Sequence, residues 1–163
     1  MIIKDERGML EAGRQLAKQL KSGMLVYLEG DLGAGKTTLV RGVLNGLGHA
    51  GAVKSPTYNL VEPYTIKDQA VFHFDLYRLV EAEELEYMGL RDYLNNQAIC
   101  FIEWPEKAGG LLPEPDLLIK INKLFIRISK KLFSFQFMLV CKINPSLDYL
   151  LNYAEIDNKK NNE

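Results

Sequence analysis

The chain has 163 residues, of which 47% are hydrophobic and 25% are charged, so it fits one folded domain and excludes wholesale disorder. Its net charge of −1 gives no overall attraction to nucleic acid or to an anionic membrane. The charge is uneven, since residues 1–116 carry 12 Lys and Arg against 17 Asp and Glu, whereas residues 117–163 carry 8 against 4. The basic end would suit contact with RNA, but we favour its interpretation as a solvated terminus.

Cysteine usage and apolar runs indicate the compartment. Cys100 and Cys141 are too few for a disulfide framework, and no Cys-x-x-Cys pair indicates a zinc site. The first ten residues, MIIKDERGML, lack the long apolar segment of a secretory signal. The apolar run at residues 132–141 is too short to cross a bilayer. We therefore expect a cytoplasmic protein with no membrane partner.

Predicted helices and strands alternate along the first hundred residues. Helices are assigned where apolar residues recur at helical spacing, and strands where short apolar runs are bounded by turn residues. In chain order the sequence predicts a helix over 8–21, a strand over 24–29, a helix over 35–47, strands at 58–64 and 70–75 joined by a turn near Lys67 and Asp68, a helix over 81–88 capped by Gly89, a strand over 98–103, a loop over 109–116, and strands at 117–121 and 124–128.

This alternation predicts a layered α/β fold. The adjacent strands at 58–75 suggest an antiparallel addition, so we expect a mixed sheet. No internal repeat and no clear linker divides the chain. We expect a single domain over residues 1–156, followed by a disordered polar tail over 157–163.

The stretch GDLGAGKTT at residues 30–38 fits the phosphate-binding loop, with Gly30 and Gly35 at its required spacing before Lys36 and Thr37. Glycines let the backbone approach a ligand, and successive N–H groups form an anion-binding concavity at the positive end of a helix. Lys36 would reach the β- and γ-phosphates, and the Thr37 hydroxyl would bind Mg²⁺. Strand–loop–helix context favours this over a plain glycine-rich turn. The expected binding residues are Asp31, Leu32, Gly33, Ala34, Gly35, Lys36, Thr37 and Thr38.

Two carboxylates at the ends of apolar strands, Asp75 and Glu103, are candidates to complete the metal site. Open α/β sheets bind ligands at strand ends, and a carboxylate commonly completes a Mg²⁺ shell. Asp75 could instead cap a turn or pair with Arg78, and Glu103 could simply face water. Beside a phosphate loop we favour function for both. Glu103, followed by Trp104 and Pro105, suits a rigid metal ligand, and Asp75 suits orienting the attacking water or holding a metal-bound water.

The stretch KSPTY at residues 54–58 is a third candidate part of the site. Pro56 stiffens the backbone, and Ser55 and Thr57 offer hydroxyls to a γ-phosphate, a metal or a water. Taken alone, the stretch is better interpreted as a turn that enters a strand. His73 is interpreted as an ordinary half-buried strand residue.

Five stretches together resemble one family. GDLGAGKTT, KSPTYNLVEPY, HFDLYRL, EELEYMGLRDY and ICFIEWPEKAGGLLPEPD, in this order and spacing, are similar to the bacterial TsaE (YjeE) family, the small ATPase of tRNA threonylcarbamoyladenosine synthesis. The resemblance covers roughly residues 5–121. The phosphate loop is generic, whereas SPTY, HFDLYR and IEW in combination are specific.

The resemblance implies a three-layer αβα fold of the phosphate-loop class that binds ATP or ADP and Mg²⁺. It implies that Thr37 and Glu103 hold the metal, that Asp75 is needed for hydrolysis, and that the acidic stretch Asp5–Glu6 lies near the nucleotide base. It also implies TsaB- and TsaD-type partners, with tRNA contacted through that complex and no DNA partner. In the family, TsaD-type subunits modify the adenosine beside the anticodon, and ATP hydrolysis by TsaE supports repeated turnover.

Two other functions stay open at this point. A small-molecule kinase would need an acceptor pocket and arginines that clamp the phosphate, but the six arginines of this chain form no cluster in a lid-like loop. A nucleotide-gated binding module with little hydrolysis would use the same cradle. Since no arginine is obviously placed as a finger, we expect slow hydrolysis by the chain alone and acceleration by partners.

Beyond about residue 122 the chain departs from the family's pattern, which continues with a polar strand pair and a Gly-Arg turn near the nucleotide. The sequence there is rich in Lys, Asn, Ile, Leu and Phe, as either a shifted reading frame of AT-rich DNA or divergence would produce. No C-terminal nucleotide contact is therefore carried over, and Arg127 is assigned no role.

Overall fold

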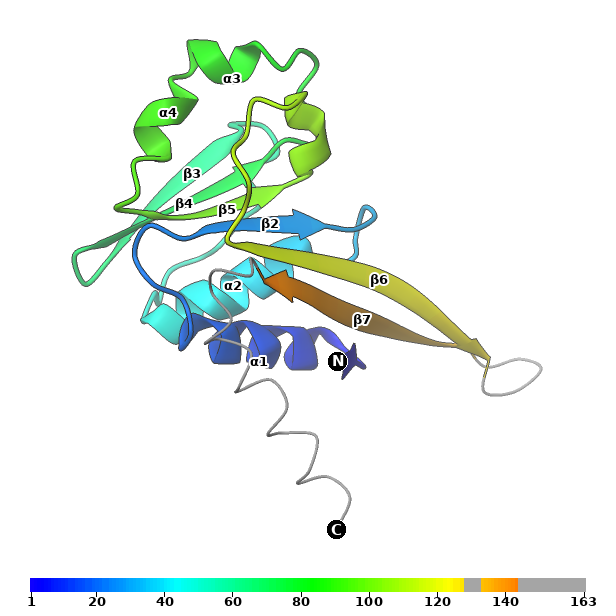
Figure 1. The fold of residues 1–163 in the computed structure, drawn as a ribbon. Helices are drawn as coiled ribbons and strands as arrows, with labels where there is room; N and C mark the ends of the chain where they lie inside the picture. The colour runs from blue at the N-terminus through cyan, green and yellow to red at the C-terminus, as the bar shows by residue number, and fades with distance from the viewer. Residues whose placement is uncertain (128–132, 144–163) are drawn as a thin grey trace.

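The computed structural model describes residues 1–127 and 133–143, which form a seven-stranded sheet in the order β1-β7-β6-β2-β5-β4-β3. Helices α1 and α2 lie on one face of the sheet, and α3 and α4 lie on the other (Figure 1). The elements are β1 (Ile2–Ile3), α1 (Glu6–Ala17), β2 (Leu25–Glu29), α2 (Lys36–Leu47), β3 (Val61–Ile66), β4 (Gln69–Asp75), α3 (Glu84–Tyr87), α4 (Leu90–Tyr93), β5 (Ile99–Glu103), η1 (Pro105–Ala108), β6 (Leu117–Arg127) and β7 (Phe133–Ile143).

The centre of the sheet is parallel and its margins are antiparallel. Strand β2 pairs in parallel with β5 and β6, and β5 pairs in parallel with β4. The pairs β3–β4, β6–β7 and β1–β7 are antiparallel. The three-layer α/β fold with a mixed sheet is therefore confirmed. Because parallel strands end at the same edge, the carboxyl ends of β2, β4 and β5 meet, and the register places Asp75 beside Glu103.

Strand β2 illustrates why the sheet is buried on both faces. Its residues alternate between two cores, since Val26 and Leu28 pack with helices α1 and α2, whereas Leu25 and Tyr27 pack on the face covered by α3 and α4. A strand with two buried faces needs a continuous apolar run rather than an alternating one, and MLVYL is such a run.

Helices α1 and α2 approach closely through glycines. A Cβ at Gly13 would lie 2.4 Å from the carbonyl oxygen of Leu39, and one at Gly42 would lie 2.3 Å from the carbonyl oxygen of Leu10. Backbone therefore packs on backbone at this crossing. The contact fixes helix α2, whose first residue is Lys36, against the sheet.

Several predicted elements differ from those observed. The helix expected over 81–88 is observed only as the single turn α3, and a second single turn, α4, lies beyond it. Gly89, with a left-handed φ of 75°, separates the two turns and is the N-cap of α4. Strands were expected at 117–121 and 124–128, but residues 117–127 form one strand, β6, since pairing with β7 continues through the polar Asn122. Strands β1 and β7 were not predicted. The turn at Lys67 and Asp68, both with positive φ, is confirmed.

Within the described residues, no helix is long and apolar enough to cross a membrane. Residues 133–141 of the apolar run at 132–141 instead lie in strand β7 of the sheet. The domain boundary expected at residue 156 and the tail expected over 157–163 lie outside the described residues.

We predict that Gly13→Ala or Gly42→Ala destabilises the protein. Alanine in a helix normally adds about 0.5–1 kcal/mol relative to glycine, but overpacking costs about 1–3 kcal/mol. Urea unfolding should show a lower free energy for both variants. The control is Gly8→Ala in α1, the helix that also contains Gly13. The new Cβ at Gly8 would meet only side-chain atoms, at 3.1 and 3.3 Å. Equal or higher stability of the two variants would contradict close backbone packing.

Candidate functional site

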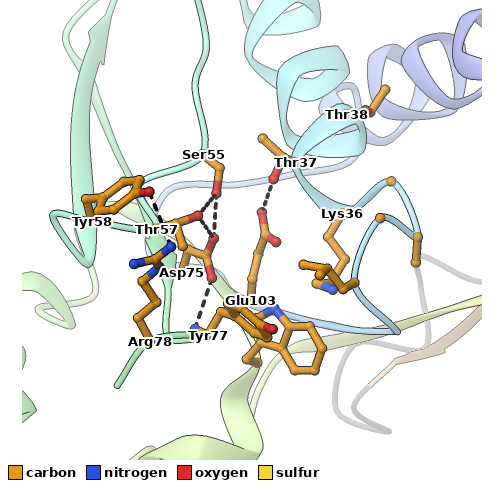
Figure 2. Close-up of a pocket in the computed structure, with 15 residues that line it drawn as sticks. Lys36, Thr37, Thr38, Ser55, Thr57, Tyr58, Asp75, Tyr77, Arg78 and Glu103 are labelled. Carbon is orange, nitrogen blue, oxygen red and sulfur yellow. Dashed lines mark hydrogen bonds between the residues drawn. The ribbon is translucent and has the colours of Figure 1, made fainter. Parts of the chain in front are cut away.

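A cavity of about 530 Å³ opens at the edge where β2, β4 and β5 end (Figure 2). The loop between β2 and α2, the stretch before β3, and the residues after β4 and β5 all contribute to its wall. It is lined by Leu32, Gly33, Ala34, Gly35, Lys36, Thr37, Thr38, Ser55, Thr57, Tyr58, Asp75, Tyr77, Arg78, Glu103 and Trp104.

The loop between β2 and α2 has a backbone that requires glycine. Gly30, Gly33 and Gly35 have φ values of 151°, 72° and 99°. A Cβ at Gly30 would lie 2.6 Å from the carbonyl oxygen of Ile121 on β6. Helix α2 begins after Gly35 with no side-chain hydrogen bond at its N-cap, so its first N–H groups are left for a ligand.

Strand β6 also supports this loop, which the sequence did not indicate. The Lys123 ammonium donates a hydrogen bond to the carbonyl oxygen of Leu32 at 2.6 Å. Lys123 follows the point at which the resemblance fades, and no motif marks it. Only the pairing of β6 beside β2 brings it to the loop.

Lys36 is a buried cation whose hydrogen-bond acceptors are neutral. The residue is 4% exposed, and its ammonium donates to the carbonyl oxygens of Gly30 at 2.5 Å and Asp31 at 3.1 Å. The ammonium also lies 4.0 Å from the ring centroid of Trp104. Burial lowers the pKa of Lys36 below its usual range, and the nearby carboxylate of Glu103 partly offsets that shift. An anionic ligand would satisfy this charge better than two carbonyls do.

Trp104 takes an unusual backbone conformation to provide this contact. Its φ of 59° is in the left-handed region, which a bulky residue rarely adopts. The chain turns there from β5 into η1, and the ring packs between Lys36 and Tyr77, whose ring centroid is 5.1 Å away. Trp104 therefore forms a wall of the cavity, and it also packs against the core on the α3 and α4 face of the sheet.

Glu103 connects three elements. Its side-chain oxygen Oε1 accepts a hydrogen bond from the Thr37 hydroxyl at 2.8 Å and lies 2.8 Å from Nε2 of His73. The expectation that His73 is half-buried is wrong, because the residue is fully buried. Its polar ring is accommodated there by the partner carboxylate on the neighbouring strand, which periodicity along one strand does not reveal.

The donor set around Glu103 fits a small hard cation. A hydroxyl and a carboxylate lie together at the mouth of the loop, and Mg²⁺ prefers oxygen ligands with several waters or phosphates. Among residues 1–127 and 133–143, no group of three or more His, Cys, Asp or Glu side chains could hold a metal ion by itself. A cation held here by Thr37 and Glu103 would therefore depend on phosphate and water oxygens.

Asp75 gathers the stretch at 54–58 against the end of β4. Its Oδ2 accepts hydrogen bonds from the hydroxyls of Ser55 at 2.5 Å and Thr57 at 2.6 Å. Its Oδ1 accepts from the backbone N–H of Tyr77 at 3.0 Å, so Asp75 also forms the turn considered as its alternative role. The KSPTY stretch is therefore part of the cavity wall and not only a turn.

Arg78 lies in the cavity wall, where the sequence had offered it only as a partner for Asp75. Its guanidinium stacks 4.2 Å from the ring centroid of Tyr58 and donates to the Tyr58 hydroxyl at 3.2 Å. Its position three residues after the strand-end aspartate, within HFDLYR, is the signal that could have placed it.

Two expected binding residues do not line the cavity. Glu6 forms an ion pair with Arg41 at 3.1 Å, although Met9, one turn later in α1, lies against the loop at Gly35. Asp31 contributes its carbonyl oxygen to Lys36. Their roles stay predictions. The other expected residues, Leu32, Gly33, Ala34, Gly35, Lys36, Thr37, Thr38, Asp75 and Glu103, all line the cavity.

Comparison with known proteins identifies the family. The family model described as threonylcarbamoyl adenosine biosynthesis protein TsaE matches residues 3–130. The chain belongs to the TsaE family. The match extends past residue 122, so the family pattern reaches further than the 5–121 expected from the motifs and includes the part of β6 that supports the loop.

Similar TsaE family members occur in several bacteria. Proteins named tRNA threonylcarbamoyladenosine biosynthesis protein TsaE are 56% identical over 125 residues in Haemophilus influenzae (74% of this chain and 79% of that protein) and 36% identical over 135 residues in Rickettsia felis (82% and 77%). The Bacillus subtilis protein of that name is 39% identical over 103 residues, which span 63% of this chain and 64% of that protein.

The fold is similar to that of YdiB from Bacillus subtilis, known from a crystal structure. The TM-score is 0.70 at 25% sequence identity, and the match covers 97% of this chain and 94% of YdiB. The phosphate-loop (P-loop) NTPase type of fold expected of a TsaE family member is therefore confirmed.

We predict that Ser55→Ala with Thr57→Ala loosens residues 54–60. Hydrogen bonds to a charged acceptor contribute about 1.5–3 kcal/mol each, less where exposed, so amide hydrogen exchange in this segment should become roughly tenfold faster at about 1.4 kcal/mol per decade. Mass spectrometry of exchanged peptides measures it. Thr65→Ala, at an exposed threonine of β3, is the control. Unchanged exchange would show that Asp75 does not hold the stretch.

Proposed function

We propose that this TsaE family member is a Mg²⁺-dependent ATPase that supports threonylcarbamoyladenosine modification of tRNA, acting in the cytoplasm with TsaB- and TsaD-type partners. The observation that carries the proposal is Lys36, a buried cation with neutral acceptors at the start of a helix whose N–H groups have no side-chain cap. Family membership supplies the pathway, since the relatives are named for that modification.

The loop residues bind the phosphates in this proposal. Backbone N–H groups at the start of α2 and the Lys36 ammonium surround the β- and γ-phosphates. When the nucleotide binds, the Lys36 ammonium exchanges the neutral carbonyl oxygens of Gly30 and Asp31 for negatively charged phosphate oxygens. ADP presents the same β-phosphate, so it binds the same cradle.

Thr37 and Glu103 would hold the metal through oxygen atoms that already lie 2.8 Å apart. When bound, Mg²⁺ supplies positive charge that neutralises the β- and γ-phosphate oxygens. Because Glu103 is 3% exposed, little water competes for its carboxylate, and the position stays rigid at the end of a buried strand.

Asp75 orients the attacking water or a metal-bound water. Its carboxylate lies in the cavity wall next to Glu103 in the strand register, and it is 3% exposed. The hydroxyls of Ser55 and Thr57 fix its orientation. A group that positions or deprotonates a nucleophile in this way contributes about 10²–10⁴-fold to a rate.

We expect slow hydrolysis by the chain alone. The guanidinium of Arg78 is held on Tyr58 rather than on the side chains of the phosphate-binding loop. Arginine fingers that a partner protein supplies raise the rate of hydrolysis by about 10³–10⁵. A TsaB–TsaD-type complex that engages the mouth of the cavity would accelerate turnover. In the complex, tRNA is contacted by the partners and not by the nucleotide site.

Reconstitution tests this function. Modified adenosine is measured from tRNA, threonine, bicarbonate, ATP and the partner proteins, with and without this chain. Lys36→Ala should weaken ATP binding by at least about tenfold, because one charge-assisted contact contributes about 1.5–3 kcal/mol, and it should abolish multiple turnover. Lys120→Ala, which removes an exposed ion pair with Glu29, is the control and should behave as wild type.

Contrary results would separate the parts of the proposal. Unchanged ATP affinity of Lys36→Ala in calorimetry would mean that the loop is not the nucleotide site. Phosphorylation of a small acceptor by the isolated chain would favour a kinase. If the chain alone hydrolyses ATP as fast as it does with the partner proteins, the proposed stimulation by the partners is wrong.

We predict that the two acids act differently. Glu103→Ala should raise the Mg²⁺ concentration needed for tight ATP binding, since it removes a metal contact. Asp75→Ala should leave ATP binding nearly intact and lower hydrolysis by about 10²–10⁴-fold. Binding and turnover are titrated against Mg²⁺ for both variants. If only Asp75→Ala changes the Mg²⁺ requirement, the roles are reversed. If neither variant changes binding or turnover, both acids are structural.

A further inference from the structure

His73 is a buried polar side chain that the proposed reaction does not use. It lies on β4, two residues before Asp75 and on the same face of the strand, and it is fully buried. Its Nε2 atom lies 2.8 Å from Oε1 of Glu103 on the neighbouring strand β5. The same Oε1 atom accepts the Thr37 hydroxyl at 2.8 Å. One carboxylate oxygen is therefore held from two directions, by β4 and by α2.

The geometry decides which ring nitrogen carries the proton. Nδ1 of His73 is buried and has no hydrogen-bond partner among the described residues. If the ring carried a proton on Nδ1 alone, this buried N–H donor would have no acceptor. The lone pair of Nε2 would then face the lone pairs of the carboxylate oxygen of Glu103, which is unfavourable. With its proton on Nε2, the ring donates to Glu103 and leaves only an acceptor unpaired at Nδ1. His73 is thus the donor in this pair.

The unpaired Nδ1 also argues against a role in packing alone. A leucine has nearly the same volume as histidine and would fill this space without a buried, unsatisfied nitrogen. The imidazole costs stability relative to that alternative. What it provides is a fixed hydrogen bond to one oxygen of Glu103.

We propose that His73 is a positioning residue for the metal site. Together with Thr37 it holds Oε1 of Glu103, so that the plane of the carboxylate is fixed and Oε2 is presented to the cation that accompanies the nucleotide. This inference rests on the proposed role of Glu103 as a metal-holding residue. Removing a residue that hydrogen-bonds to a metal ligand typically lowers metal affinity by about 10–100-fold.

A matched pair of variants tests it. In His73→Gln the side-chain amide nitrogen reaches about as far as Nε2 and can still donate, whereas His73→Leu has similar volume and no donor. Mg²⁺ is titrated into each protein with a non-hydrolysable ATP analogue, and binding is followed by calorimetry. His73→Leu should raise the half-saturating Mg²⁺ concentration at least about tenfold. His73→Gln should stay close to wild type, and affinity for the analogue without Mg²⁺ should be unchanged in both.

Val71→Ala is the control for loosened packing. Val71 is fully buried on the same strand and the same face, and it belongs to the core beneath helices α1 and α2. The variant should lower thermal stability and leave the Mg²⁺ requirement unchanged. If Val71→Ala or His73→Gln raises that requirement as much as His73→Leu does, packing explains the effect and the inference is overturned. An unchanged requirement in His73→Leu overturns it as well.

Two further measurements keep the result decisive. Long-range ¹⁵N–¹H spectra of the metal-free wild-type protein should show the His73 proton on Nε2, and a proton on Nδ1 alone would overturn the inference even if His73→Leu fails to fold. Glu103→Gln separates this inference from the function on which it rests. If Glu103→Gln leaves the Mg²⁺ requirement of binding unchanged, the metal role of Glu103 fails, and the role of His73 fails with it.

Discussion

The burial of one positive charge organises this protein. Lys36 is 4% exposed at the first position of α2, and its ammonium contacts two carbonyl oxygens and an aromatic ring. A desolvated cation of this kind is unfavourable unless an anion joins it. The glycine conformations of the loop, the close packing of α1 on α2 and the left-handed turn at Trp104 all help to place that charge in the wall of the cavity.

Around this charge, acids on adjacent strands take different environments. Glu103 faces the start of α2 through Thr37 and is held by His73, so it belongs to the rigid part of the site. Asp75 instead holds the hydroxyls of a loop that precedes β3. A loop attached by side-chain hydrogen bonds can rearrange more easily than a buried strand. The site therefore combines a half that is fixed by buried strands with a half that is attached by the side chains of a loop.

Sequence patterns predicted the central part of this fold because its signals are local. The run MLVYL, the glycine loop and the amphipathic helices are each fixed by neighbouring residues, and they appear within a few positions of the predicted bounds. The last strands were missed or divided because β6 and β7 depend on each other. Their pairing continues past Asn122 and Lys123, where polarity along one strand suggests a break.

The sequence alone determined the family, the phosphate-loop fold and two strand-end acids. Each of these depends on a short stretch of contiguous residues whose types and spacing can be recognised without the structure. Only the tertiary structure decided which groups meet. His73 is 30 positions from Glu103, and Lys123 is 91 positions from Leu32, yet strand pairing brings each pair within hydrogen-bond distance. The same structure separated Glu6 from the cavity by pairing it with Arg41. Such contacts depend on the order and register of strands, which cooperative packing of the whole sheet sets.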